Sequence, residues 1–117
     1  MSLSWLWKKE EKPVVCYHIE GFLNCKYMQN AIAIAESVKA RDETTTVQIS
    51  SNAFEKPQWQ ERLEQLRQEF ANSPEAQTHK TSPFIFEGCK ESERKFVGGY
   101  DSFMATLKDR HCPRPPR

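Results

Sequence analysis

The sequence predicts an α/β fold in which helices cover both faces of a four-stranded mixed sheet. Three observations support this fold class. Two β-prone runs, 14–19 and 44–49, flank an amphipathic helix. A second amphipathic helix follows from Pro57, and two further apolar runs, 82–86 and 94–97, then lead into a short last helix. The predicted order of elements is therefore β-α-β-α-β-β-α.

Length and charge limit the classes of function. A chain of 117 residues suits one domain, and a net charge of +1 gives no case for binding nucleic acid or an anionic membrane through charge. The longest apolar run, 31–35, is too short to cross a bilayer. Trp5 and Trp7 ahead of two lysines do not match a secretory signal peptide. We expect an N-terminal lead (1–13), a domain (14–109) and a flexible tail (110–117).

The cysteines give no sign of a metal site. They stand at 16, 25, 89 and 112 without any C-x-x-C pair, and the histidines do not complete zinc-ligand spacing. The sparse spacing also favours a reducing, intracellular location, the cytoplasm, over a disulfide framework. We expect Cys16 to be structural and Cys89 to be exposed. A regulatory or intermolecular disulfide at Cys89 or Cys112 has only the position of these residues in its favour.

The first half of the chain predicts a parallel crossover. A buried strand runs over 14–19 and is broken by Glu20-Gly21. A helix then runs from Cys25 to about Lys39, with Asn24 as its N-cap. The β-branched run 44–49 supplies the second strand. The expected buried face of the helix consists of Met28, Ala31, Ile34 (or Ile32), Ala35 and Val38.

The second half predicts a helix, a hairpin and a last helix. Segment 50–56 is expected to be a connection, and 72–80 a polar loop. The strands at 82–86 and 94–97 form an antiparallel hairpin, and Asp101 is the N-cap of the last helix. The expected buried positions of the two helices are Trp59, Leu63, Leu66, Phe70, Phe103, Met104 and Leu107. The outer face of the helix at Pro57 is expected to be solvated, namely Gln60, Glu61, Arg62, Glu64, Gln65 and Arg67.

Cys25 is the candidate reactive residue. It stands where a strand gives way to a helix, and the unpaired N–H groups and dipole of a helix start stabilise a thiolate. The alternative is a small buried side chain without chemistry, which is the usual place of a free cysteine.

Three local signatures, in this order of elements, resemble the glutaredoxin family of the thioredoxin-fold superfamily. They are Cys25-Lys26-Tyr27-Met28 in place of C-P-Y-C, Thr81-Ser82-Pro83 in place of T-V-P, and Val97-Gly98-Gly99-Tyr100-Asp101 in place of I-G-G-C-D. The resemblance spans about Val14 to Leu107. The long turn between the last two strands, together with Trp59, is also similar to the glutaredoxin-like domain fused to certain malate-dehydrogenase-like proteins.

The resemblance implies a thioredoxin-like fold and a monothiol, glutathione-dependent thiol–disulfide oxidoreductase with Cys25 as nucleophile. Glutathione would be the co-substrate, and glutathionylated or disulfide-bonded molecules the substrates. Pro83 would be a cis-proline, and the backbone of Ser82 would pair with the glutathione cysteine. The remaining glutathione-binding residues implied by the family are Tyr27, Gly98, Gly99, Tyr100 and Asp101.

Several positions depart from the family pattern. Met28 replaces the second cysteine, Lys26 replaces the motif proline, and no basic residue precedes the motif, so His79 or Lys80 would meet the glycine carboxylate of glutathione. The Lys26-Tyr27 pair argues against the iron–sulfur cluster that some monothiol relatives hold. The alternative function is a binding module of the same fold that has lost turnover.

The motif also lies about three residues further from the first strand than in the family. An ungapped match would put Phe22 at the nucleophile position. The phase of the buried helix positions favours Cys25 instead.

Overall fold

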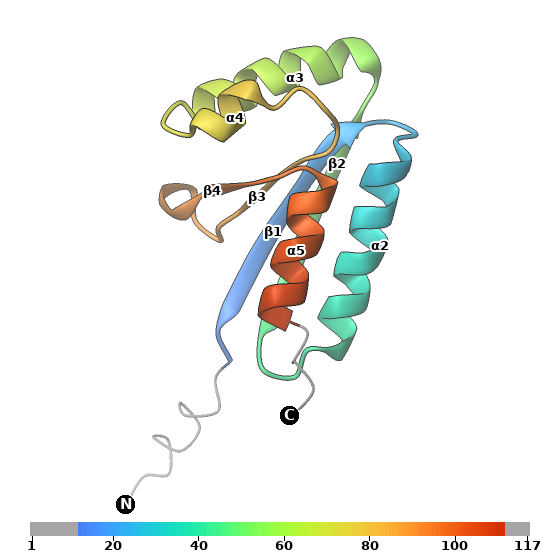
Figure 1. Cartoon of the computed structure of the whole chain (residues 1–117), viewed down its shortest axis with the longest axis vertical. Helices are drawn as coiled ribbons and strands as arrows, with labels where there is room; N and C mark the ends of the chain where they lie inside the picture. Colours follow the sequence, from blue (N-terminus) through green and yellow to red (C-terminus); the bar gives the residue numbers. More distant parts are fainter. Residues whose placement is uncertain (1–11, 112–117) are drawn as a thin grey trace, which may run out of the picture.

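Strand β1 (Val14–Phe22) lies inside the sheet of the computed structural model, which describes residues 12–111. The sheet order is β2-β1-β3-β4, with β1 parallel to β2 and the other neighbours antiparallel. Helices lie on both faces of the sheet (Figure 1). The predicted α/β class with a four-stranded mixed sheet is therefore confirmed.

The parallel crossover predicted for the first half is present. Helix α2 (Lys26–Arg41) joins β1 to β2 (Thr46–Phe54), and the two strands pair from Val14–Thr46 to Phe22–Phe54. The expected face of α2 is buried, since Met28, Ala31, Ala35 and Val38 have little exposure. Both strands are longer than predicted, because β1 continues through Glu20-Gly21 and β2 takes in most of the expected connection.

The second half adds one element to the prediction. Helix α3 (Lys56–Glu69) buries the expected apolar residues, and a short helix α4 (Pro74–Thr78) replaces part of the expected loop. Ser73 caps α4 by accepting a hydrogen bond from the amide of Ala76 at 3.3 Å. The hairpin consists of β3 (Phe84–Glu87) and β4 (Lys95–Gly98), with a single 3-10 turn, η1 (Glu91–Glu93), between them.

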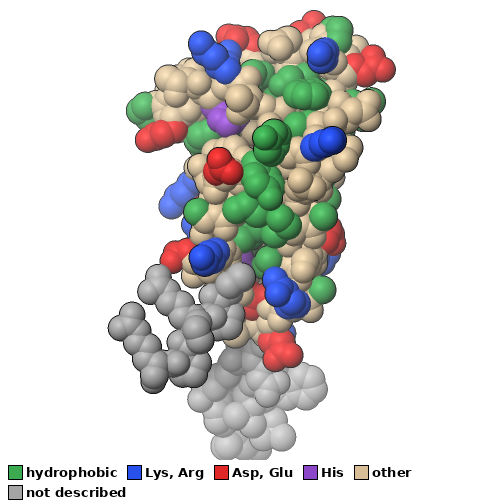
Figure 2. All heavy atoms as spheres, turned by 45° about the vertical axis from the view of Figure 1, so that its right-hand side comes forward, with side chains coloured by type: hydrophobic (Ala, Val, Ile, Leu, Met, Phe, Trp, Pro, Cys, Tyr) green, Lys and Arg blue, Asp and Glu red, His purple; other side chains and the backbone are tan. Residues whose placement is uncertain are grey.

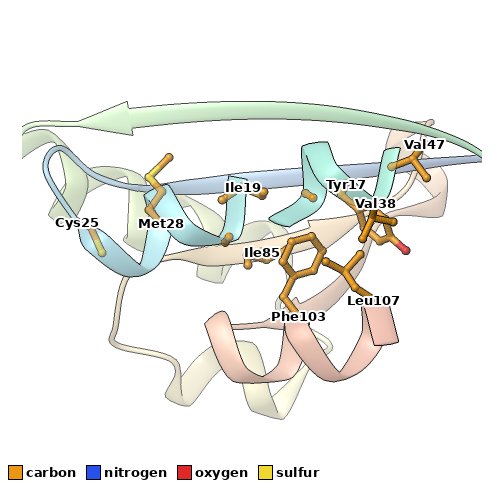
Figure 3. Close-up of a cluster of buried hydrophobic side chains, with 11 residues drawn as sticks. Tyr17, Ile19, Cys25, Met28, Val38, Val47, Ile85, Phe103 and Leu107 are labelled. Carbon is orange, nitrogen blue, oxygen red and sulfur yellow. The ribbon is translucent and has the colours of Figure 1, made fainter. Parts of the chain in front are cut away.

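Two hydrophobic clusters fill the two sides of the sheet. One lies between the sheet and helices α2 and α5 (Tyr100–His111), and Figure 3 shows its side chains converging from both. The other gathers Trp59, Leu63, Leu66, Phe70, Ala76, Phe84 and Phe86 under α3 and α4. The two clusters hold the strands and α2 in place, so the end of β1 and the start of α2 have a defined position.

Some side chains expected in solvent make ion pairs. The carboxylate of Glu20 is buried, and Arg62 holds it with two hydrogen bonds, Nε to Oε1 at 2.6 Å and Nη2 to Oε2 at 2.9 Å. This pairing raises the pKa of Arg62. The prediction that Arg62 is solvated is therefore wrong, and the pair explains how β1 continues through a glutamate.

Helix α5 extends further than the sequence predicted. Arg110 and His111 belong to it, so the flexible tail does not begin at residue 110. His111 Nδ1 donates to Asp42 Oδ2 at 2.5 Å, and Nε2 hydrogen-bonds the Tyr17 hydroxyl at 2.7 Å. Burial raises the pKa of Tyr17, and the hydrogen bond from His111 lowers that of Asp42. The network ties the end of α5 to β1 and to the end of α2.

A disulfide joins Cys16 to Cys89. The sparse cysteine spacing argued against disulfides, so this intramolecular bond differs from the expectation, although Cys16 is buried and Cys89 exposed as predicted. The expectations for the lead at 1–11 and for Cys112 lie outside the described residues.

On the face shown in Figure 2, outside the grey atoms, positively and negatively charged side chains are mixed around apolar ones. This face therefore has no large patch of one charge. Within residues 12–111, no helix has the length and apolar character needed to cross a bilayer.

Candidate functional site

Cys25 lies at the N-terminal end of α2. It is the N-cap residue, with extended backbone angles, and its carbonyl accepts the first helical hydrogen bond from Gln29 N at 3.0 Å. The amides of the three residues between them therefore have no partner within the helix. The predicted N-cap, Asn24, instead adopts a positive φ of 67° in the turn before the helix.

The thiol of Cys25 is directed toward the loop before β3. Its Sγ donates to the carbonyl of Ser82 at 3.7 Å, and the side chain is only 6% exposed. Figure 3 shows Cys25 at one end of the buried cluster, next to Met28 in the following turn. Cys25 is the one free cysteine among residues 12–111. Phe22, the rival for this position, is the last residue of β1 and not the start of the helix.

The peptide bond between Ser82 and Pro83 is cis, as the resemblance implied. Pro83 is buried, and the Ser82 hydroxyl accepts a hydrogen bond from the amide of Phe22 at 3.1 Å. The loop therefore contacts both the end of β1 and the thiol of Cys25. Residues that are 57 positions apart in the chain meet here.

Gly21 makes this contact between strand and loop possible. A Cβ at this position would lie 2.2 Å from Ser82 Oγ, 2.9 Å from Met28 Sδ and 3.4 Å from Pro83 Cα. Any larger side chain would force Ser82 and Met28 to move. From the sequence, Gly21 was expected only to break the strand. A glycine within a β-prone segment is also a signal for a close backbone approach.

A pocket of about 410 Å³ opens beside Cys25. Tyr27 from α2, the loop residues Thr81 and Ser82, and the start of α5 form its walls. The full lining is Tyr27, His79, Thr81, Ser82, Gly99, Tyr100, Asp101 and Ser102. Tyr27 is 61% exposed, and its ring lies 5.6 Å from that of Tyr100. Two aromatic rings therefore flank one side of the opening.

The start of α5 forms the far wall of the pocket. Gly98 has a φ of 137°, which favours glycine, and a Cβ there would lie 2.6 Å from that of Ser102. The helix begins at Tyr100, and the amide of Phe103 donates to the carbonyl of Gly99 at 3.0 Å. Asp101 lies in the first turn of the helix and not at its N-cap, which corrects the expectation.

His79 is the other polar group in the wall. Its Nε2 donates to the carbonyl of Pro83 at 2.9 Å, and Arg67 Nη2 donates to the carbonyl of His79 at 2.9 Å. His79 is half-buried, whereas Lys80 is exposed and does not line the pocket. Of the two residues considered for contact with a ligand carboxylate, only His79 therefore faces the pocket.

The structure brings together most residues that the family resemblance singled out. Tyr27, Ser82, Gly99, Tyr100 and Asp101 share the pocket wall. Cys25 and Pro83 do not line the pocket but adjoin Ser82, through the contact of Cys25 Sγ with the Ser82 carbonyl and through the Ser82–Pro83 peptide bond, and Gly98 is buried before the start of α5. Sequence reasoning missed Thr81 as a lining residue in its own right, Ser102 and the spacing role of Gly21.

The chemistry available here is that of a thiol and polar backbone groups. The free amides at the start of α2 favour a negative charge on a ligand or on Cys25. Among the residues that the structure describes, no group of three or more histidine, cysteine, aspartate or glutamate side chains is arranged to hold a metal ion.

Comparison of the chain with family models, with curated proteins and with solved structures found no significant match.

Proposed function

We propose that this domain has a thioredoxin-like, glutaredoxin-type fold and acts as a monothiol, glutathione-dependent thiol–disulfide oxidoreductase. Support comes first from the topology, since the sheet order β2-β1-β3-β4 places the start of α2 beside the loop before β3. It comes also from the three local signatures, because all three lie at one end of the sheet.

One observation carries the proposal. The thiol of Cys25 lies at a helix N-terminus, 3.7 Å from the carbonyl of Ser82 in the cis-proline loop, and Ser82 also lines a pocket of about 410 Å³. A thiol placed in this way can exchange with a sulfur that an extended peptide brings to the loop. The backbone of Ser82 offers hydrogen-bonding groups to such a peptide.

The proposed reaction needs only one protein thiol. The thiolate of Cys25 attacks the glutathionyl sulfur of a mixed disulfide, forms a Cys25–glutathione disulfide and releases the substrate as a thiol after protonation. The thiolate of a second glutathione then attacks the glutathionyl sulfur on Cys25. This step releases oxidised glutathione and regenerates Cys25. Met28, in the place of the second family cysteine, is buried and takes no part.

The pocket offers partners for the two ends of glutathione. Asp101 carries a carboxylate for the γ-glutamyl amino group, and the start of α5 offers free amides for the adjacent carboxylate. We assign the glycine carboxylate to His79, which lines the same pocket. Tyr27 and Tyr100 provide the apolar surface between them.

A second function, a binding module without turnover, has one observation in its favour. The side chain of Cys25 is 6% exposed and does not line the pocket, so a substrate sulfur must displace part of the wall to reach it. In this case the pocket would bind glutathione or an extended peptide while Cys25 remains inert.

The test is an assay of glutathione-dependent reduction of a glutathionylated peptide, together with glutathione binding by calorimetry. We expect activity in the wild type, none in Cys25→Ser, and a raised KM for glutathione in Asp101→Ala. Ser37→Ala, on the exposed face of α2, is the matched control for Cys25→Ser and should leave both readouts unchanged. Glutathione binding without activity in the wild type would support the module, and the absence of both would refute the enzyme and a module that binds glutathione.

A further inference from the structure

The Cys16–Cys89 disulfide lies far from the proposed active site. Cys16 belongs to the first half of β1, whereas the site begins at the end of this strand. The six residue steps from Cys16 to Phe22 correspond to roughly 20 Å of extended chain. Cys25 therefore cannot exchange with this disulfide within one molecule.

The two cysteines of the disulfide differ in their exposure to solvent. Cys16 is 8% exposed, whereas Cys89 lies in the exposed part of the turn between β3 and β4. A thiolate from outside reaches a disulfide along the line of the S–S bond and attacks the accessible sulfur. Attack at Cys89 makes Cys16 the leaving group.

The disulfide also borders a pocket. Its volume is about 540 Å³, and both cysteines line it. The other lining residues include Val14, Val15, Glu93, Lys95 and Arg110. Apolar strand residues and charged residues of both signs therefore line the pocket together with the two cysteines.

Both sulfur atoms have an acceptor in place for a free thiol. Gln48 Oε1 lies 3.5 Å from Cys16 Sγ, and the carbonyl of Val14 lies 3.9 Å from Cys89 Sγ. After reduction the two sulfur atoms move apart by rotation of their side chains, and each S–H then has an acceptor near its present position. Each thiol therefore has a candidate partner in the opened state.

Other bonds hold the two segments together when the disulfide is open. The amide of Gly88 donates to the carbonyl of Cys16 at 2.9 Å, and His18 Nε2 donates to the carbonyl of Gly88 at 2.8 Å. The ring of His18 also stacks on Phe86, with 4.7 Å between centroids. Since these contacts do not involve sulfur, the cysteines stay close enough to pair again.

From these contacts we infer that Cys16–Cys89 is a second, reversible thiol–disulfide exchange site, and that a dithiol reductant enters it at Cys89. One thiolate of the dithiol attacks Cys89 Sγ, and Cys16 leaves as a thiolate that takes up the proton lost by the attacking thiol. The second thiol then attacks the sulfur of the dithiol in this mixed disulfide, releasing Cys89 as a thiol. Two electrons pass from the dithiol, which becomes a disulfide, to the cysteine pair.

The role of a disulfide depends on the redox state of its compartment. Stable structural disulfides belong to oxidising compartments, and those in reducing compartments are mostly transient or redox-sensing. Cys16–Cys89 fits the transient or redox-sensing kind. Cys89 is exposed, both cysteines have acceptors nearby, and the backbone contacts between the two segments do not depend on sulfur.

The experiment uses the full chain with Cys25→Ser and Cys112→Ser, so that failure of the proposed enzyme function cannot affect the result. Dithiothreitol is the probe, thiol labelling with a mass tag follows the cysteine pair, and circular dichroism follows the fold. We expect the reduction rate to rise in proportion to dithiothreitol concentration while the circular dichroism stays unchanged. Oxidised glutathione should then restore the disulfide. Two outcomes would overturn the proposal. In one, the reduction rate stops rising with dithiothreitol concentration and equals the unfolding rate. In the other, the chain isolated under oxidising conditions lacks this disulfide.

A second arm tests entry at Cys89. In the same background, Cys16→Ser leaves Cys89 alone and Cys89→Ser leaves Cys16 alone. Oxidised glutathione should modify the first variant several-fold faster than the second, as measured by mass spectrometry. Equal rates, or faster modification of Cys16, would rule out Cys89 as the point of entry.

Discussion

Gly21 determines how closely strand β1 and the cis-proline loop approach each other. In Gly21→Ala, the new Cβ would lie 2.2 Å from Ser82 Oγ and 2.9 Å from Met28 Sδ. We expect a loss of about 1–3 kcal/mol in the free energy of unfolding, because the loop and the methionine must move. Urea denaturation measures it.

Gly99→Ala is the matched control for this prediction. Its Cβ would lie 3.0 Å from the nearest atom, His79 Cε1, compared with 2.2 Å for Gly21→Ala, so the strain is smaller. We expect a smaller loss of stability than in Gly21→Ala. Equal losses in the two variants would show that the close approach at Gly21 has no special cost.

Asp42 makes the stability of the domain depend on pH. Its carboxylate accepts hydrogen bonds from His111 and Thr44, which hold its pKa below the usual value near 3.9. A carboxyl with a lowered pKa in the folded state stabilises the fold above its unfolded pKa, and this contribution is lost as pH falls through the folded pKa. The difference in stability between wild type and Asp42→Asn should therefore narrow as pH falls from about 5 toward 2.

Urea denaturation at a series of pH values measures this difference. Asp109→Asn, which changes an exposed carboxylate of α5, is the control and should follow the wild type throughout. A gap for Asp42→Asn that is constant with pH would contradict the assignment.

At the scale of single residues, the sequence predicted positions better than contacts. Cys25 and Pro83 stand in recognisable local motifs, so their places at a helix start and at a cis peptide bond could be expected. The partners of Asp42 could not, because His111 lies 69 residues away and no local period connects them. Hydrogen bonds of this kind depend on how the elements pack.

Between elements, the Glu20–Arg62 pair connects β1 with α3. Arg62→Met leaves the buried carboxylate of Glu20 without its main partner. We expect a loss of about 3 kcal/mol in the free energy of unfolding, since an unpaired charge in the interior is costly. Replacing both residues together, in Glu20→Met with Arg62→Met, should recover most of this loss.

Glu64→Ala provides the control for the ion pair. Glu64 is exposed, and its pair with Arg67 spans 3.5 Å on the surface of α3, so its removal should change stability by no more than about 0.5 kcal/mol. A double variant as unstable as Arg62→Met would mean that packing of the arginine stem, and not charge, holds β1 to α3.

The ends of elements were the hardest part of the fold to predict. Periodicity placed the buried faces of α2 and α3 correctly, because these faces repeat every three to four residues. It ended β1 at Glu20-Gly21 too early, because a charged residue and a glycine look like a strand end. Glu20 fits within the strand because Arg62 pairs with it, and Gly21 is needed there because Ser82 approaches closely. Both Arg62 and Ser82 come from distant segments.

At the scale of the whole molecule, the Cys16–Cys89 bond closes a long covalent loop, with a sequence separation of 73. Such a bond restricts the unfolded chain, so reduction should lower the free energy of unfolding by about 2–4 kcal/mol. Urea denaturation with and without dithiothreitol measures the effect, and Cys89→Ser should match the reduced wild type and not respond to the reductant. A reductant effect that persists in Cys89→Ser would assign it to another group.

The position of β1 in the sheet decides when the proposed site can exist during synthesis. Cys25 enters the chain early, but its pocket needs the loop at 81–83 and the start of α5, which follow more than fifty residues later. Until β3 is made and pairs with β1, one edge of β1 stays open and the thiol has no wall beside it. A nascent or truncated chain that stops before β3 therefore presents a solvent-accessible Cys25 without any means of selecting its partner. Completion of the sheet therefore changes Cys25 from an accessible thiol into a buried one.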